Sequence, residues 1–258
     1  MSRTSTAMVS AFAAVTVIVG CSSDYKSPMQ PAPPAHQASV VTASGVITPE
    51  VARFRTLIGD PANGGTPGQQ PGGRREVNWD GAGARPFNNR NDFPADFFNS
   101  NVTVGLVYVG AGFRNDSSLF ADINPTYAAE FKPFSPKVLF SAVGTNVIEV
   151  SFRVAGAATP AAVNGFGAVF TDVDLAHATS IEFFDQNGTS LGRFEAPVRS
   201  DADGLSFLGV KYEAAIVTRV RITCGNAALA AGVNDVTSGG TKDLVVIDNV
   251  IYGEPTAL

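Results

Sequence analysis

Two pairs of aspartates have a spacing that could place carboxylates around a metal ion. Asp172 and Asp174 follow an apolar stretch, and Asp201 and Asp203 precede Gly204 in a turn-like segment. Side chains two residues apart in a strand point to the same side of the sheet, and calcium takes about six to eight oxygen ligands. Asp172 and Asp174 are therefore candidate ligands of a structural calcium ion, although neither pair completes a site alone. The alternative is that Asp172 and Asp174 accept hydrogen bonds from loop amides, and that Asp201 and Asp203 lie in a solvated turn.

Histidine and cysteine chemistry has little support in the sequence. His36 and His177 are the two histidines, and Cys21 and Cys224 are the two cysteines. A zinc site usually needs about three or four nitrogen or sulfur ligands. A Ser-His-Asp triad would depend on His177, and the sequence lacks the Gly-x-Ser-x-Gly motif of many serine hydrolases. Cys224 lies in a strand-like run, so we interpret it as a small packed residue.

Three glutamates could in principle supply the carboxylate pair of a glycoside hydrolase or lyase. Glu149, Glu182 and Glu213 each occupy an outward position of an alternating segment. Nothing in the sequence brings two of them to the separation of about 5–10 Å that glycoside hydrolysis requires. We interpret them as solvated sheet surface, so the sequence leans away from catalysis without excluding it.

Trp79 is the single tryptophan and stands among polar residues. Arg75 and Asn78 precede it and Asp80 follows. A flat aromatic ring beside hydrogen-bonding side chains is a common arrangement in binding sites. We therefore predict Trp79, Arg75 and Asn78 as ligand-binding residues, with the loop 85–98 as the rim of the site. The alternative is that Trp79 fills the core beside the glycine-rich loop 60–73.

Composition restricts the class of protein. The chain has 258 residues, of which 45% are hydrophobic and 16% charged, and its net charge is −5. This hydrophobic content argues against a disordered chain, and the absence of a basic excess argues against a nucleic-acid partner. The 26 glycines, 16 prolines and 18 phenylalanines favour strands and turns over long helices.

The N-terminus has the features of an export signal. Arg3 precedes an apolar run, 7–19, that is too short to span a bilayer as a helix. The run ends at Cys21 in a pattern that resembles the lipobox of bacterial lipoproteins, which implies a signal peptide over 1–20 and acylation of Cys21 by diacylglycerol and fatty acids such as palmitate. The alternative is an ordinary secretory peptide. The resemblance also implies the outer membrane, because Ser22 follows the cysteine where an aspartate would favour the inner membrane.

The rest of the chain predicts a short helix followed by many strands. Residues 21–43 read as a proline-rich tether and 44–258 as one domain. Thr48 as N-cap and Gly59 as stop bound an amphipathic helix. Segments with strand patterns then follow: 102–109, 147–154, 216–223 and 244–251. The fold class is all-β, an antiparallel β-sandwich of jelly-roll type with one short N-terminal helix.

The clearest hairpin spans 180–195. Asn187-Gly188 is typical of a type I′ turn. A two-residue loop would pair Phe184 with Leu191 and Glu182 with Arg193, and would leave Phe184 on the outer face. We expect a second layer or loop to cover Phe184, since an uncovered apolar patch would indicate a contact surface.

Four segments resemble a family of exported bacterial β-sandwich proteins that are mostly uncharacterised: 165–174, 179–188, 205–210 and 246–253. The last is also similar to the closing strand of carbohydrate-binding jelly rolls. The resemblance covers about 45–254 and implies a fold and an exported location more firmly than an activity.

The function that we predict is a lipid-anchored, non-catalytic protein of the cell envelope that binds a glycan or another extracellular ligand. Its partners would be the membrane, through the lipid at Cys21, and a polysaccharide or an envelope protein. One alternative is a structural or adhesion module, and a jelly-roll glycoside hydrolase or lyase is a weaker one. The sequence does not identify the ligand or the oligomeric state.

Overall fold

The structure is a computed structural model that describes Met1 and residues 36–81, 86–110, 112–201 and 204–258. Residues 2–35, which include Cys21 and most of the predicted signal peptide, lie outside the described residues, as does Asp203. No helix within the described ranges is long and apolar enough to cross a bilayer.

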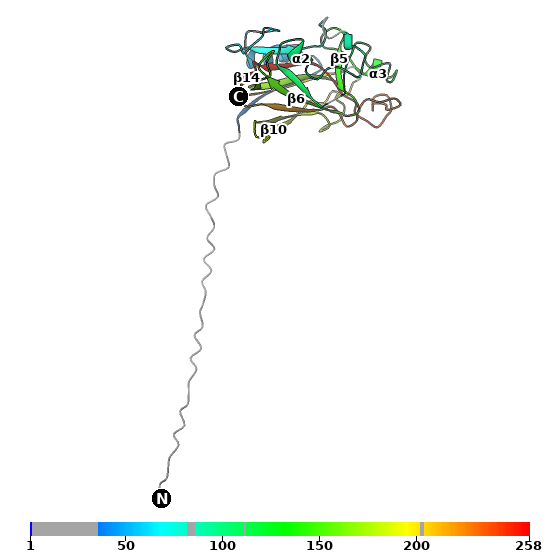
Figure 1. Ribbon diagram of the computed structural model, residues 1–258. Helices are drawn as coiled ribbons and strands as arrows, with labels where there is room; N and C mark the ends of the chain where they lie inside the picture. Colours follow the sequence, from blue (N-terminus) through cyan, green and yellow to red (C-terminus); the bar gives the residue numbers. More distant parts are fainter. Residues whose placement is uncertain (2–35, 82–85, 111, 202–203) are drawn as a thin grey trace. The chain divides into compact units, whose positions relative to one another are not determined.

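The strands form two antiparallel sheets of seven strands each, which pack as a β-sandwich and confirm the predicted fold class (Figure 1). The first sheet has the order β1-β11-β8-β13-β5-β4, and β2 also pairs with β13. Its strands are β1 (Ala38–Ser44), β2 (Arg74–Val77), β4 (Phe113–Asp116), β5 (Leu139–Ala142), β8 (Gly165–Thr171), β11 (Leu205–Tyr212) and β13 (Val246–Gly253). The second sheet has the order β10-β9-β12-β6-β7-β14, and β3 pairs with β6. Its strands are β3 (Leu106–Val109), β6 (Val147–Arg153), β7 (Pro160–Ala162), β9 (Ser180–Phe184), β10 (Ser190–Glu195), β12 (Arg219–Thr223) and β14 (Thr256–Ala257).

The core between the sheets follows from alternation along the strands. In β6, Ile148, Val150 and Phe152 are buried, whereas Glu149 and Ser151 are half-buried on the other face. This is the pattern that the sequence predicts. Each large apolar side chain moved from water into the core contributes about 1.5–3 kcal/mol, so the alternation fixes which face of each strand points inward.

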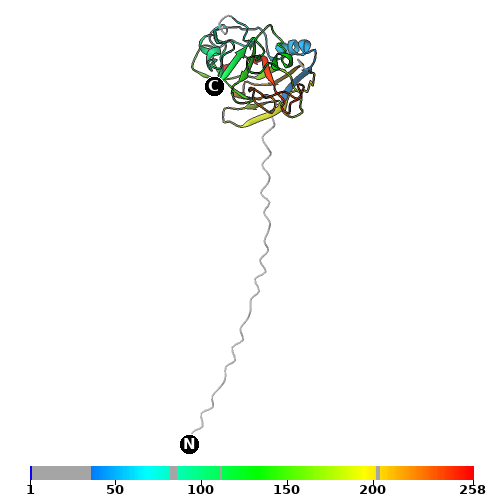
Figure 2. The same ribbon diagram turned by 90° about the vertical axis from the view of Figure 1, so that its right-hand side faces the viewer.

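The helix α1 (Thr48–Ile58) covers part of the outer face of the first sheet (Figure 2, blue helix). Its Phe54 ring lies on two glycines of β8 and β11. A Cβ atom on Gly209 would lie 2.6 Å from Phe54 Cδ2, and one on Gly167 would lie 2.8 Å from Phe54 Cε1. The helix can therefore approach the sheet this closely because these two residues lack side chains.

A loop with the one-turn helix α3 (Tyr127–Glu130) covers another part of the first sheet. The buried side chains that make this contact come from the loop, β5, β13 and the residues before β13: Phe120, Tyr127, Phe131, Leu139, Leu244 and Val246. Because α1 and this loop both lie on the outer face, β8 and β13 are buried along both faces. The short helix α2 (Phe97–Ser100) contributes Phe97 and Phe98 to the core between the sheets.

Two predicted boundaries near the N-terminus need correction. The predicted tether extends to residue 43, but Ala38–Ser44 is strand β1 and pairs along its whole length with β11. The β-branched residues of this segment extend the sheet at the otherwise unpaired edge of β11, which outweighs the proline-rich context before it. In α1 the cap residue is Ile47, and no side chain caps the helix, so the predicted N-cap role of Thr48 is wrong.

The hairpin of β9 and β10 also differs from its prediction at the turn. Glu182 pairs with Arg193 as predicted, but Phe184 pairs with Ser190 because Leu191 lies in a bulge. Gly188 has a positive φ of 76° and Asn187 does not, so the turn is not type I′. Asp185 Oδ1 accepts hydrogen bonds from the backbone N–H groups of residues 187 and 189, which stabilises a longer loop.

The outward ring of Phe184 is covered, as expected, although by arginine rather than by a loop. The guanidinium carbon of Arg219 lies 3.7 Å from the ring centroid, and that of Arg221 lies 5.6 Å from it. Both arginines also pair with Glu149 on the neighbouring strand, at 3.0 and 2.7 Å. Charged pairs and cation–π contacts therefore cover the outer face of the second sheet where β6, β12 and β9 lie side by side.

Candidate functional site

A pocket of about 650 Å³ lies where the segment after β2 meets the loop before β5. The lining residues are mostly polar and come from four segments: Asn78, Trp79 and Asp80 after β2; Asn88; Asn115 and Ser117 at the end of β4; and Pro136, Lys137 and Val138 before β5. Amide, carboxylate, hydroxyl and ammonium groups therefore surround one concave surface, and Trp79 also lines it.

Trp79 forms part of this pocket while remaining a core residue. The side chain is 1% exposed, and the indole stacks on Phe140 with ring centroids 4.7 Å apart. The alternative interpretation, that Trp79 fills the core, is therefore confirmed by its burial. The face of the ring is not free to stack on a ligand, so the polar groups around the pocket must make the contacts that orient one.

Two aspartates hold the loop that forms one wall of the pocket. Asp248 Oδ2 accepts hydrogen bonds from the backbone N–H groups of Phe134 and Ser135, at 2.6 and 2.9 Å. Asp80 Oδ1 accepts one from the N–H of Val138 at 3.1 Å. The Ser135 hydroxyl lies within hydrogen-bond distance of both carboxylates, 2.8 Å from Asp80 and 3.1 Å from Asp248. The wall is thus fixed by backbone hydrogen bonds at both ends.

Asp248 is fully buried, and burial raises its pKa to about 7. The backbone N–H groups of the loop favour the ionised form and oppose this rise, whereas the nearby Asp80 carboxylate adds to it. Asp248 is therefore a structural carboxylate behind the pocket wall that titrates near neutral pH.

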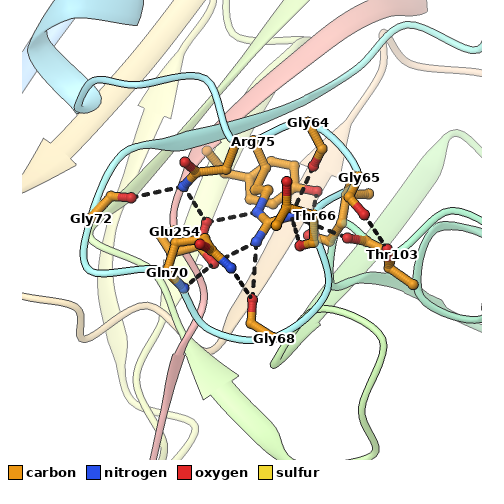
Figure 3. A network of polar contacts seen from close by, with 12 residues as sticks. Gly64, Gly65, Thr66, Gly68, Gln70, Gly72, Arg75, Thr103 and Glu254 are labelled. Atoms are coloured by element: carbon orange, nitrogen blue, oxygen red, sulfur yellow. Dashed lines mark hydrogen bonds and ion pairs between the residues drawn. The ribbon is translucent and has the colours of Figure 1, made fainter.

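Arg75, the third predicted ligand-binding residue, lies inside the protein and does not line the pocket. Its guanidinium donates to Glu254 through Nε at 2.6 Å and Nη2 at 2.7 Å. Further donations go to carbonyl oxygens: those of Gly64, Thr66, Gly68 and Thr103. Figure 3 shows the glycine-rich loop curving around this side chain. Arg75 therefore organises the loop 60–73, and the structure brings together only Trp79 and Asn78 of the three predicted residues.

The predicted metal ligands Asp172 and Asp174 lie at the end of β8, in a cluster of five buried carboxylates. One carboxylate oxygen from each of Glu130, Asp172 and Asp235 lies within 4.8 Å of the others, and the same holds for Asp174, Asp235 and Asp243. Antiparallel pairing places the end of β8 beside the start of β13, and α3 and the loop before β13 supply the remaining members.

Burial and mutual repulsion disfavour ionisation in this cluster. Burial, followed by the neighbouring carboxylates of Asp235 and Asp174, raises the pKa of Asp172 to about 9. Burial, followed by the interaction with the Asp235 carboxyl group, raises the pKa of Asp174 to about 8, and burial raises that of Asp243 to about 6. The residues that the sequence did not single out are Glu130, Asp235 and Asp243, because each belongs to a different segment and no local spacing relates them to Asp172.

The other candidate side chains lie away from both places. His177 is 78% exposed and pairs with Glu195. Arg221 of β12 lies between two glutamates, since it pairs with Glu149 of β6 on one side and with Glu182 of β9 on the other. A cation therefore separates the two carboxylates. Cys224 is free and buried, and burial raises the pKa of its thiol to about 12, which fits the predicted packing role. Asp201 pairs with Arg199 at the surface.

No family model and no curated protein sequence matches this chain. Among solved structures, the enzymatically active domain of tailspike protein 4 from bacteriophage CBA120 is 14% identical, with a TM-score of 0.27 over 63% of this chain and 20% of that one. The CBM22-1 xylan-binding domain from Paenibacillus barcinonensis is 12% identical, with a TM-score of 0.26 over 62% of this chain and 90% of that one. The chain thus matches about a fifth of the tailspike domain's length. Both TM-scores are below 0.5, so neither likeness carries an argument about function.

Proposed function

We propose that this protein is a non-catalytic binding module of the cell envelope, and that the pocket beside Trp79 takes a hydroxyl-rich ligand, a glycan. The observation that carries the proposal is the lining of the pocket. Neutral amides outnumber charged groups there, and Lys137 and Asp80 contribute one charge of each sign. This balance suits a neutral ligand with many hydroxyl groups better than an anion or a cation.

The pocket has groups available for such a ligand. Asn88 Nδ2 donates to the Ser117 hydroxyl at 2.6 Å, whereas Asn88 Oδ1 has no hydrogen-bond partner among the described residues. A buried amide oxygen without a partner is costly. This oxygen exposes less than 1 Å², so a ligand hydroxyl that donates to it must first turn the Asn88 side chain towards the pocket. Asp80 uses both carboxylate oxygens internally, on Ser135 and Val138, which fits a structural role better than a catalytic one.

The proposed binding is testable with Trp79 as an internal probe, since it is the single tryptophan. We expect at least one glycan of a polysaccharide array to retain the protein. Titration of the protein with that glycan should change the fluorescence emission of Trp79. Asn88→Ala should weaken binding about tenfold, the effect of one lost hydrogen bond of about 1.4 kcal/mol. Asn187→Ala, in the exposed hairpin turn, is the matched control and should bind as the unmodified protein does. Equal affinity of Asn88→Ala and Asn187→Ala for that glycan would refute the proposal. Absence of any retention on the array would also refute it.

We also propose that Cys21 anchors the module to a membrane, most simply the outer one. The support is the apolar run, the small residue Gly20 before Cys21 and the proline-rich stretch after it. The full chain made in a Gram-negative host should incorporate labelled palmitate and sediment with membranes. Cys21→Ser should lose the label entirely; a labelled Cys21→Ser chain would show that the anchor lies elsewhere.

A further inference from the structure

The five-carboxylate cluster at the end of β8 presents a problem of charge. Glu130 is 2% exposed, Asp174 is 8% exposed, and Asp172, Asp235 and Asp243 are 0% exposed. The chief influences on the pKa of Asp172 are burial and the other four carboxylates, and all of them raise it. Ionised carboxylates are rarely buried together without a compensating cation, because each costs several kcal/mol to remove from water.

The hydrogen bonds divide the cluster into two kinds of carboxylate. Asp235 accepts hydrogen bonds from the backbone N–H groups of Thr237 and Leu244. Asp243 accepts them from the backbone N–H groups of Asp174 and Leu175. Glu130 accepts the hydroxyl groups of Thr237 and Ser238. Donors from the loop before β13 therefore orient Glu130 and Asp235, and donors from the segment after β8 orient Asp243.

Asp172 and Asp174 are the other kind. All four of their carboxylate oxygens are buried without a hydrogen-bond partner. Asp172 also has a left-handed backbone, with φ of 71°, which an L-residue other than asparagine or aspartate rarely adopts. The local alternative suggested by the sequence, that these carboxylates accept hydrogen bonds from loop amides, is therefore not what the structure shows. Their oxygens point instead toward the oriented carboxylates of Glu130, Asp235 and Asp243.

We propose that these residues form a divalent-cation centre of the calcium type, made of two carboxylate triads that share Asp235. Calcium fits because every candidate ligand is an oxygen, and because about six to eight oxygens at flexible distances are its usual set. Magnesium prefers to keep several waters, and zinc prefers nitrogen or sulfur ligands. The positive charge of two ions would balance the negative charge of the five carboxylates more closely than that of one ion. Asp235 would then be the ligand that bridges the two ions.

The cation would join three segments that are distant in sequence. Glu130 ends α3, Asp172 and Asp174 follow β8, and Asp235 and Asp243 belong to the loop between β12 and β13. The bound ion would therefore hold this long loop against the end of the first sheet. Lys242 is exposed in the loop, directly before Asp243, and is its single lysine or arginine, so it provides a protease site that reports on this attachment.

The test uses the full chain, freed of metal with a chelator and then titrated with calcium chloride. We expect one or two calcium ions to bind per chain by equilibrium dialysis. A free calcium concentration of about 100 times the dissociation constant should raise the Tm by about 5–10 °C. Tryptic cleavage after Lys242 should slow about tenfold or more, because the protease acts on the opened loop. Magnesium at the same concentration should have a much smaller effect.

Asp172→Asn is the deciding variant. It keeps the shape of the side chain and cannot ionise, so it should fold in chelator at least as stably as the unmodified protein. It should, however, lose most of the calcium-induced rise in Tm and the protection of Lys242. Glu213→Gln, an exposed carboxylate change outside the cluster, should respond to calcium as the unmodified protein does. Absence of bound calcium, or an undiminished response in Asp172→Asn, would overturn the proposal. Neither outcome depends on whether the pocket beside Trp79 binds a glycan.

Discussion

Replacement of Arg75 by methionine is expected to lower the free energy of unfolding by about 3–5 kcal/mol, the usual effect of leaving one member of a buried ion pair without its partner. Arg75 is 0% exposed at its side chain and Glu254 is 4% exposed. The methionine side chain can fill much of the space but donates no hydrogen bond. The Glu254 carboxylate would lose its guanidinium, although it would keep the donors Asn63 Nδ2 and Gln70 N.

The change should also loosen the glycine-rich loop. The guanidinium joins carbonyl groups of Gly64, Thr66 and Gly68 to Thr103 on a separate segment. These carbonyls would lose an internal donor, so the loop between α1 and β2 should become more accessible to proteases. Chemical denaturation followed by Trp79 fluorescence measures the free energy, and limited proteolysis measures the loop.

Two further variants separate the buried pair from a general effect of removing arginine. Arg53→Met breaks a surface pair with Glu50, whose side chains are 59% and 37% exposed, and should change the free energy by less than about 1 kcal/mol. The double change Arg75→Met with Glu254→Gln should be less destabilising than the sum of the single changes, since no charge is then left unpaired. A loss in Arg75→Met no larger than in Arg53→Met would show that the pair contributes little.

The parts of the fold that could be predicted from sequence are those fixed by near neighbours. The alternation of β6 and the apolar spacing of α1 each depend on residues a few positions apart, and the structure has both. The hairpin register near Glu182 and Arg193 was also predictable, because a turn connects the strands. The bulge at Leu191 was not, since the Asp185 side chain stabilises a longer loop than the Asn187-Gly188 pair alone suggests.

The candidate sites depend on contacts that local patterns do not encode. Asp172 and Asp174 could be paired from their spacing, but Glu130 and Asp235 join them only because β8 and β13 are neighbours and a loop folds over their ends. Arg75 was predicted at a binding surface because it precedes Trp79 by four residues. In the structure Arg75 belongs to β2 and Trp79 follows it with a left-handed backbone, φ 57°. The two side chains consequently serve different parts of the molecule, one an internal ion pair and the other the aromatic core beside the pocket.

Asp248→Asn is expected to change how stability depends on pH. The carboxyl group of Asp248 has a pKa of about 7 in the folded protein, against an ordinary value of 3.8. Between about pH 4 and pH 7 the folded state therefore binds more protons than the unfolded state, so stability falls as pH rises through this range. The stabilising effect of the proton is complete below about pH 4 and is lost above about pH 7.

Asparagine carries no charge at any pH, so the variant should lack this part of the pH dependence. The free energy of unfolding of the unmodified protein should fall from pH 5 to pH 8 by on the order of 2 kcal/mol more than that of Asp248→Asn. At pH 5 the two proteins should have similar stability, because the asparagine oxygen can take the place of Asp248 Oδ2 and accept both backbone N–H groups. The NH2 group then faces the Ser135 hydroxyl, which can accept a hydrogen bond. Denaturation curves in chelator at both pH values measure the difference, and the carboxylate cluster contributes equally to both proteins and cancels.

Glu213→Gln serves as the control, because it removes an exposed carboxylate and should leave the pH dependence unchanged. Parallel curves for the unmodified protein and Asp248→Asn between pH 5 and pH 8 would mean that Asp248 is ionised throughout, held in that form by the N–H groups of the loop. The expected divergence would instead mean that the cost of burying the ionised carboxylate exceeds the stabilisation that the N–H groups of the loop give to it.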